Sequence, residues 1–278
     1  MKAFIVGKHH DHVGCQAVSM VLEGIVETHC ELVGHPKEAD VVIVNGEGSM
    51  HHNTGNLNIK TKAIRAAKER GQKVMLVNSV WDSVSSKDML ALLPNIDYIS
   101  VRELRSWTEL NRKHGLNPDI NIDLAYFYPV HMFYELTPNK EKILMGDFFP
   151  IYGGQINHKL KQHPSFIKHF SGRFKDYDIK RSKTWSEHLI GLHGAKCLIT
   201  GRHHDAIACC KVRTPFVSLV GNTHKVDGIF ELAGVNLRCA TTFGELNDKL
   251  ERLDEDLPEY EKLFDFMAQQ KCWEFPKL

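Results

Sequence analysis

The stretch from Lys196 to Val212 reads Lys-Cys-Leu-Ile-Thr-Gly-Arg-His-His-Asp-Ala-Ile-Ala-Cys-Cys-Lys-Val. Its first five residues predict a short buried strand, and the apolar run from Ala206 to Val212 predicts the first turns of a helix. Between them stand Arg202, His203, His204 and Asp205. These side chains therefore fall at the carboxyl end of a strand, where open α/β sheets bind their ligands.

An arginine beside two imidazoles at a helix N-terminus suits a phosphate or a carboxylate. The guanidinium donates paired hydrogen bonds to anions, and the helix dipole favours negative charge at the same place. The alternative is structural: Arg202 and Asp205 would form a surface ion pair, and the histidines would cap the helix.

Strand and helix patterns alternate along the rest of the chain, which is typical of parallel sheets. In the first half we expect strands at 3–6, 30–33, 39–44, 73–79, 98–101 and 120–123, and helices at 14–26, 58–70, 86–93 and 104–114. In the second half we expect strands at 143–146, 177–180, 197–200, 216–220 and 236–239, and helices at 158–169, 184–192, 205–212, 226–233, 243–253 and 259–270.

This rhythm predicts two Rossmann-like α/β domains. The polar, proline-containing segment 136–142 interrupts the alternation, so we place the N-terminal domain at 1–137 and the C-terminal domain at 138–278. The last helix is a candidate to pack back on the N-terminal domain. In this arrangement the loops at the strand ends of both domains would face one cleft.

Composition narrows the class of protein. The 278 residues carry 35 Lys and Arg against 34 Asp and Glu, so nothing in the net charge of +1 calls for nucleic acid. The N-terminus resembles no secretory signal and no stretch approaches the ~20 apolar residues of a spanning helix, which predicts a cytoplasmic protein. Two possibilities are left open by the sequence. The protein could act on a lipid-linked substrate at a membrane surface, and it could form a homo-oligomer. The seven cysteines fit reduced core thiols, and their spacing favours no metal site.

A glycine-rich turn is expected at Asn45-Gly46-Glu47-Gly48, followed by His51 and His52. The glycines would let backbone N–H groups approach a ligand, and Glu47 with His51 or His52 would exchange protons. The turn lacks the third glycine of a dinucleotide fingerprint. The structural alternative is a tight connection between strand and helix.

Other polar residues also follow predicted strands. Arg102 is expected to point into the cleft, with Glu103 improving the first turn of the next helix, although an ordinary ion pair on a solvated helix fits equally well. Asn222 and Lys225 follow the strand after the Arg202 segment, where an ammonium suits a phosphate or a sugar hydroxyl. His12 lies in a histidine-rich loop after the first strand, and we expect it to form a polar wall of the cleft.

Four of these blocks together resemble the polysaccharide pyruvyltransferase family. They are His12-Val13-Gly14 with Ala17, Asn45-Gly46-Glu47-Gly48-Ser49, Val101-Arg102-Glu103-Leu104-Arg105-Ser106, and Gly201-Arg202-His203-His204 with Pro215 and Lys225. The resemblance implies two Rossmann-like domains as in GT-B glycosyltransferases, and transfer of pyruvate from phosphoenolpyruvate to a sugar as a ketal. It also implies that Arg202, His204 and Arg102 contact the donor.

The sequence departs from the family pattern in two loops. The family commonly has Asn-x-Gly-Asp in the first and Gly-Gly-Gly in the second, whereas this chain has His12-Val13-Gly14-Cys15 and Gly46-Glu47-Gly48. The added carboxylate and histidines leave a different acceptor, or a different reaction, open.

We therefore predict a pyruvyltransferase whose donor site holds Arg102, Arg202, Lys225 and Asn222. His204 is the expected acid or base, because imidazole titrates near neutral pH, with His203 and Glu47 as further candidates. The residues expected to meet the sugar or lipid-linked oligosaccharide acceptor are His12, Asn45, His51 and His52. No metal or cofactor is required. A GT-B glycosyltransferase with a nucleotide-sugar donor and a non-catalytic sugar-binding protein remain the alternatives.

Alanine at Arg102 or Arg202 is expected to abolish donor binding with little loss of stability.

Overall fold

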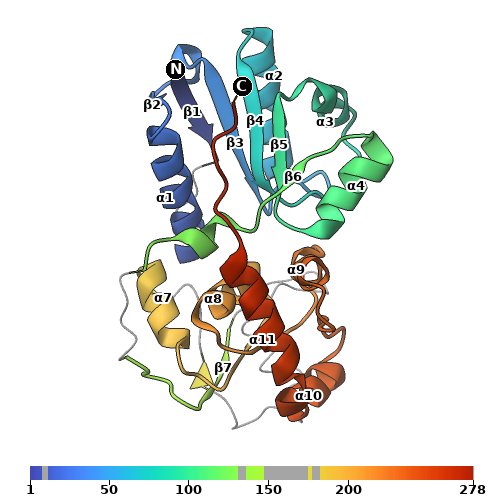
Figure 1. The fold of residues 1–278 in the computed structure, drawn as a ribbon. Helices are drawn as coiled ribbons and strands as arrows, with labels where there is room; N and C mark the ends of the chain where they lie inside the picture. Colours follow the sequence, from blue (N-terminus) through green and yellow to red (C-terminus); the bar gives the residue numbers. More distant parts are fainter. Residues whose placement is uncertain (8–11, 131–135, 147–174, 177–181, 278) are drawn as a thin grey trace. The chain divides into compact units, whose positions relative to one another are not determined.

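The computed structural model describes residues 1–7, 12–130, 136–146, 175–176 and 182–277 (Figure 1). The chain divides into two compact units. Unit 1 comprises residues 1–10, 15–128 and 271–278, and unit 2 comprises residues 11–14 and 129–270. The chain thus changes unit at Tyr128–Pro129, and the expected junction at 137/138 lies a short way into unit 2.

Unit 1 is built on a parallel six-stranded sheet with the order β2-β1-β3-β4-β5-β6. Its strands are β1 (Lys2–Val6), β2 (Glu31–Leu32), β3 (Val41–Glu47), β4 (Lys73–Ser79), β5 (Tyr98–Val101) and β6 (Asp119–Ile120). Its helices are α1 (Val13–Glu27), α2 (Gly55–Glu69), α3 (Lys87–Leu92) and α4 (Leu104–His114), with short 3-10 turns at Pro36–Glu38, Leu93–Asn95 and Leu124–Phe127.

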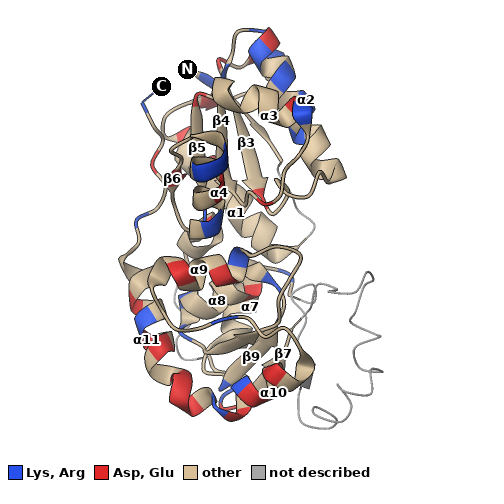
Figure 2. Ribbon diagram, turned by 90° about the vertical axis from the view of Figure 1, so that its right-hand side faces the viewer, with Lys and Arg blue, Asp and Glu red and all other residues tan. Residues whose placement is uncertain are grey.

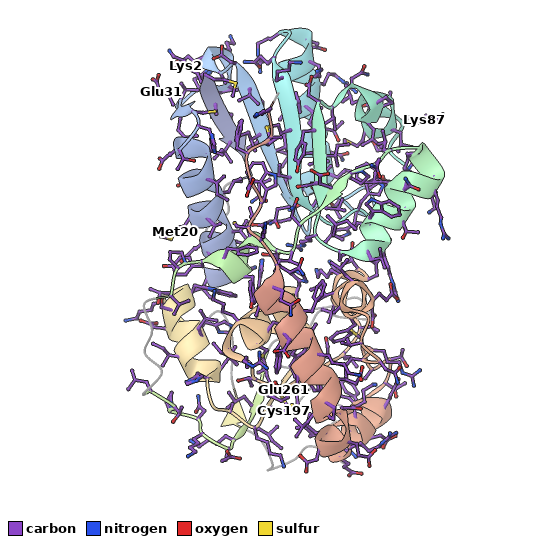
Figure 3. All side chains as sticks on the ribbon, viewed as in Figure 1. Lys2, Met20, Glu31, Lys87, Cys197 and Glu261 are labelled. Carbon is purple, nitrogen blue, oxygen red and sulfur yellow. The ribbon has the colours of Figure 1, made fainter. Side chains whose placement is uncertain are left out.

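The sheet is hydrophobic on both faces because helices cover both. Alternate residues of β3 and β4, such as Val42 and Leu76, share one apolar cluster with Ile64 of α2 and Leu110 of α4. At the β1–β2 edge the register pairs Lys2 with Glu31, which lie together in Figure 3. The strand order reverses between β1 and β3, so the fold's ligand crevice is expected at their carboxyl ends.

Three helices of unit 1 begin at side-chain caps. Thr54, Ser86 and Glu103 each accept a hydrogen bond from a backbone N–H in the first turn of α2, α3 and α4. The expected effect of Glu103 on its helix is therefore confirmed. Helix α4 ends at Gly115, whose φ of 66° is the left-handed conformation that glycine adopts readily.

Unit 2 contains a parallel four-stranded sheet with the order β10-β9-β7-β8. Its strands are β7 (Ile143–Met145), β8 (Lys175–Asp176), β9 (Cys197–Thr200) and β10 (Phe216–Ser218). Its helices are α7 (Trp185–Leu192), α8 (His203–Val212), α9 (Lys225–Ala233), α10 (Phe243–Glu251) and α11 (Leu253–Gln269). The order reverses between β7 and β9, which repeats the switch point of unit 1.

Some elements of unit 2 differ from expectation. The expected strand at 236–239 does not form; the neighbouring Ala240 makes only a parallel bridge with Leu219. The expected helix at 158–169 and strand at 177–180 lie outside the described residues. Helix α11 belongs to unit 2, and only the tail after it joins unit 1.

The C-terminal tail runs along the sheet of unit 1 (Figure 1). The indole N–H of Trp273, a residue only 3% exposed, donates to the hydroxyl of Tyr98 on β5 at 3.0 Å. Phe275 stacks on His29, with ring centroids 5.3 Å apart. These contacts hold the tail against unit 1, with Trp273 buried and Phe275 partly exposed.

In unit 2, acidic side chains lie near the N-terminus of α11, where the helix dipole is positive. The first turn of α11 carries three acidic side chains, at positions 254–256, and Figure 2 shows acidic residues along this helix. Negative charge there stabilises the helix N-terminus. Among the described helices, none is long and apolar enough to cross a membrane.

Candidate active site

The Arg202 segment stands at the switch point of unit 2, between the end of β9 and the start of α8. Arg202 is the N-cap of α8 and makes no side-chain capping hydrogen bond. His203 and His204, expected in a loop, form the first helical turn and are 4% and 8% exposed. The first N–H groups of a helix have no intrahelical acceptor, so this end of α8 is suited to an anion.

The structure contradicts the surface ion pair that was the alternative for this segment. Asp205 is completely buried, and its Oδ2 accepts a 2.5 Å hydrogen bond from Thr200 Oγ1. Its Oδ1 lies 3.2 Å from Nε2 of His188, which is also fully buried. The histidines do not cap the helix either, because the N-cap position belongs to Arg202.

Aromatic rings surround His204. The rings of His12 and His204 meet edge to face with centroids 5.0 Å apart, and the indole of Trp185 lies 6.4 Å away. Gly14 leaves the room for this arrangement, because a Cβ added there would lie 2.6 Å from Cβ of His204. The sequence singled out His12 and Gly14, and the structure brings both to His204 within unit 2.

The second cationic segment of unit 2 is also helical. Lys225, expected in a loop, is the first residue of α9 and only 6% exposed. Its Nζ donates to Oδ1 of Asn222 at 3.0 Å. Asn222 and Lys225, both predicted for the donor site, are therefore in direct contact. The ammonium is held at the N-terminus of α9.

In unit 1 the expected glycine-rich turn is wrong in its first part. Asn45, Gly46 and Glu47 are the last three residues of β3, because Asn45 and Glu47 stay in register with Val77 and Ser79 of β4. A Cβ added to Gly46 would lie 2.6 Å from Cβ of Ser79. Glycine at position 46 thus permits β3 and β4 to pack closely. The expected close approach of a ligand does not explain this glycine.

Glu47 ends β3 with a φ of 40°, an unusual conformation for a residue other than glycine. The carboxylate is buried and accepts hydrogen bonds from Cys15 Sγ and Asn45 Nδ2, both at 3.2 Å. Burial raises the pKa of this carboxyl group, while the Cys15 hydrogen bond and the nearby charges of Arg102 and Lys60 oppose the rise. A strained, buried carboxyl group with a raised pKa at a sheet switch point is a strong candidate for acid or base chemistry.

Lys60 supports this strand end from α2. Its ammonium is buried and donates to the carbonyl of Gly46 at 2.8 Å. Burial lowers the pKa of Lys60 to about 8, against the opposing charge of Glu47. Lys60 was not predicted as a site residue, because a lysine in the helical pattern of α2 is typical of a solvated face.

Arg102 does not lie on a solvated helix. It is 2% exposed and forms an ion pair with the fully buried carboxylate of Asp123, which also begins the 3-10 turn after β6. Its Nε, by contrast, is buried and has no hydrogen-bond partner among the described residues. Arg102 is therefore a core residue, contrary to the premise of the expected variant, and its removal is expected to lower stability.

His51 and His52 lie in the connection after β3. Their Nδ1 atoms are 2.9 Å apart, His51 is 7% exposed, and Nε2 of the exposed His52 is 3.9 Å from Asp82 Oδ1. Both His52 and Asn53 have a positive φ, so the chain turns sharply there before α2 begins at Gly55. The pairing of either histidine with Glu47 for proton exchange remains a prediction.

The sequence profile of the polysaccharide pyruvyl transferase family matches residues 7–223. The chain belongs to this family. The match spans both units and every residue predicted for the site except Lys225. None of the curated proteins matches the sequence.

Solved structures with a similar fold share little sequence with this family member. They include MnaA of S. aureus with UDP (TM-score 0.62, 11% identity, 95% of this chain and 90% of that one). A functionally uncharacterised protein of Klebsiella pneumoniae has a TM-score of 0.57 at 13% identity, covering 87% and 93%. UDP-GlcNAc 2-epimerase of Neisseria meningitidis bound to UDP-GlcNAc has a TM-score of 0.53 at 12% identity, covering 90% and 75%. These similarities confirm the expected GT-B-like class with two Rossmann-like units.

Proposed function

We propose that this protein transfers a pyruvyl group from phosphoenolpyruvate to two hydroxyl groups of a sugar, forming a ketal. The observation that carries the proposal is the Arg202-His203-His204 turn at the switch point of unit 2, in a chain of the polysaccharide pyruvyl transferase family. A partly exposed arginine at the N-cap and two imidazoles in one helical turn supply cationic and proton-transferring groups together.

The donor carries a phosphate and a carboxylate on three carbons, so its site requires cations from more than one direction. Arg202 and Lys225, each at the N-terminus of a helix in unit 2, are the proposed contacts, with Asn222 holding the ammonium. Arg102 is a further candidate through its buried Nε. With these groups the scheme requires neither metal nor cofactor.

The proposed reaction begins with proton transfer to the methylene carbon of phosphoenolpyruvate, which leaves an oxocarbenium-like centre at C2. One sugar hydroxyl adds to C2 and loses its proton, inorganic phosphate departs, and the second hydroxyl closes the ketal while its proton leaves with phosphate. His204 is the proposed proton donor, with His203 as the neighbouring candidate.

The acceptor hydroxyl requires a base. Glu47 is the proposed base in its ionised form, because its raised pKa makes it a stronger base than an ordinary carboxylate. Asn45 orients it through the 3.2 Å hydrogen bond. His12, His51 and His52 remain proposed contacts for the sugar or lipid-linked acceptor.

The test is binding and turnover by the full chain. Calorimetry with phosphoenolpyruvate and with UDP is followed by incubation with sugar acceptors, in which phosphate release and pyruvylated product are measured. We expect phosphoenolpyruvate to bind and phosphate to appear only with an acceptor. Binding of UDP without phosphoenolpyruvate would favour a nucleotide-sugar glycosyltransferase, and sugar binding without turnover would favour a non-catalytic protein.

A further inference from the structure

Asp205 is a buried carboxylate directly behind the proposed donor site, and the proposed chemistry does not use it. Asp205 lies in the first turn of α8, together with His203 and His204, yet none of its surface is exposed. A buried charge is costly unless it is paired and hydrogen-bonded. The contacts that compensate Asp205 therefore indicate what it does.

Three elements of unit 2 converge on this carboxylate. Helix α7 brings Nε2 of His188 to 3.2 Å from Oδ1, and β9 brings the hydroxyl of Thr200, which donates to Oδ2 at 2.5 Å. From the end of β7, Gly146 approaches so closely that a Cβ there would lie 2.6 Å from Oδ2. Asp205 thus ties the two central strands at the switch point to the helix that begins beside them.

Thr200 links this carboxylate to the donor site. The same Oγ1 that donates to Asp205 accepts a 3.0 Å hydrogen bond from the backbone N–H of Arg202. The carboxylate fixes the direction of the hydroxyl proton, which leaves an oxygen lone pair facing the amide. The hydrogen-bonded chain Asp205–Thr200–Arg202 therefore sets the backbone at the N-cap of α8.

We propose that Asp205 is a positioning residue, which acts through Thr200 to hold Arg202 and the first turn of α8 in the geometry that binds the donor's anionic group. The ring of His188, whose Nε2 lies 3.2 Å from Oδ1, packs against the carboxylate from α7. This inference rests on the donor site proposed above. Misplacement of groups in a site by about an ångström can cost on the order of a hundredfold in rate.

Two substitutions at Thr200 separate positioning from packing. Thr200→Val keeps the shape and removes the hydroxyl, whereas Thr200→Ser keeps the hydroxyl and removes a methyl group. We expect Thr200→Val to weaken binding of phosphoenolpyruvate about tenfold, the effect of losing one hydrogen bond to a charged group, and Thr200→Ser to retain nearly wild-type affinity. A packing role predicts the reverse order.

Asp205→Asn tests the carboxylate itself, and Glu245→Gln is its control. Glu245 also lies in the first turn of a helix, where its Oε2 accepts a 2.8 Å hydrogen bond from a threonine hydroxyl, but at the start of α10. We expect Asp205→Asn to raise the donor Kd and KM several-fold in the folded protein and Glu245→Gln to change neither. Thermal unfolding identifies any variant that fails to fold, and binding is then compared between Thr200→Val and Thr200→Ser.

The outcomes separate this inference from the proposed function. If wild-type protein binds UDP and not phosphoenolpyruvate, the donor assignment fails, and the same variants are compared by UDP affinity. Equal affinities of wild type and Thr200→Val for the ligand that binds, or equal weakening by Thr200→Val and Thr200→Ser, would overturn the positioning role. A wild type that binds neither ligand overturns both proposals.

Discussion

Arg102 and Asp123 form a buried ion pair in unit 1 that joins the end of β5 to the turn after β6. The guanidinium is 2% exposed and the carboxylate is fully buried. Asp123 also accepts a 2.9 Å hydrogen bond from the backbone N–H of Ala125. Each of these two charges is therefore compensated by the other, at a position that water does not reach.

Removing one member of this pair is expected to destabilise the protein strongly. Arg102→Met leaves a buried carboxylate without its countercharge, which typically costs about 3–5 kcal/mol of unfolding free energy. Urea denaturation of the full chain measures this loss. The double variant Arg102→Met/Asp123→Asn should be more stable than Arg102→Met alone, since it removes both charges. An Arg102→Met protein with a wild-type midpoint would contradict the pairing.

A second prediction concerns the packing of β3 on β4. Gly46→Ala places a Cβ against Ser79, including its backbone Cα at 2.9 Å, so one strand must shift. We expect a loss of about 1–3 kcal/mol, as in other overpacked cores. Gly24→Ala is the control, because no atom of the described residues lies within 4 Å of a Cβ there and alanine favours a helix interior. Equal effects of the two substitutions on the unfolding midpoint would refute the close approach.

Most strands and helices of the described residues were predictable because local patterns determine them. β4, β5, β9 and α4 begin and end where the sequence predicts, since each is an apolar or amphipathic run bounded by turn or cap residues. The end of β3 was missed for a tertiary reason. Asn45 and Gly46 are turn formers locally, but pairing with β4 keeps them extended.

The candidate site was predictable only in part. Arg202, His203 and His204 follow a recognisable strand and precede a recognisable helix, so their position could be predicted. His188, Asp123 and Lys60 could not be predicted as site components, because each acquires its role from a contact with a distant part of the chain. A sequence pattern gives no distance between such partners.

The lowered pKa of Lys60 predicts a pH-dependent stability. The ordinary lysine value is 10.5 and the folded value is about 8, so between these values the unfolded chain binds more protons and stability rises with pH. Lys60→Met should remove this rise, while Lys62→Met, at an exposed neighbouring position of α2, should retain it. Urea midpoints from pH 7.5 to pH 10.5 (about the window of the two pKa values) provide the comparison. Parallel curves for wild type and Lys60→Met would show that Lys60 does not titrate in this range.

Arg202 is expected to contribute to donor binding rather than to stability. Its side chain is only partly buried, unlike that of Arg102. Arg202→Ala should weaken phosphoenolpyruvate binding roughly ten- to a hundredfold, the range for one charge-assisted contact, with an unfolding midpoint close to wild type. Arg213→Ala, at the other end of α8, is the control because its ion pairs with Glu261 and Asp265 are solvent-exposed. Unchanged donor affinity in calorimetry would exclude Arg202 from the site.

His204 is expected to act on the rate of the reaction. His204→Gln keeps a polar side chain of similar reach but cannot transfer a proton near neutral pH, so kcat should fall by about a hundredfold or more while the donor Kd changes little. His193→Gln is the matched control in unit 2, since His193 is the C-cap residue of α7 and stands outside the α8 turn. A His204→Gln variant that raises only KM would make His204 a binding group. Proton transfer would then fall to His203, which shares the same helical turn and the same burial, and His203→Gln would be expected to show the loss of kcat instead.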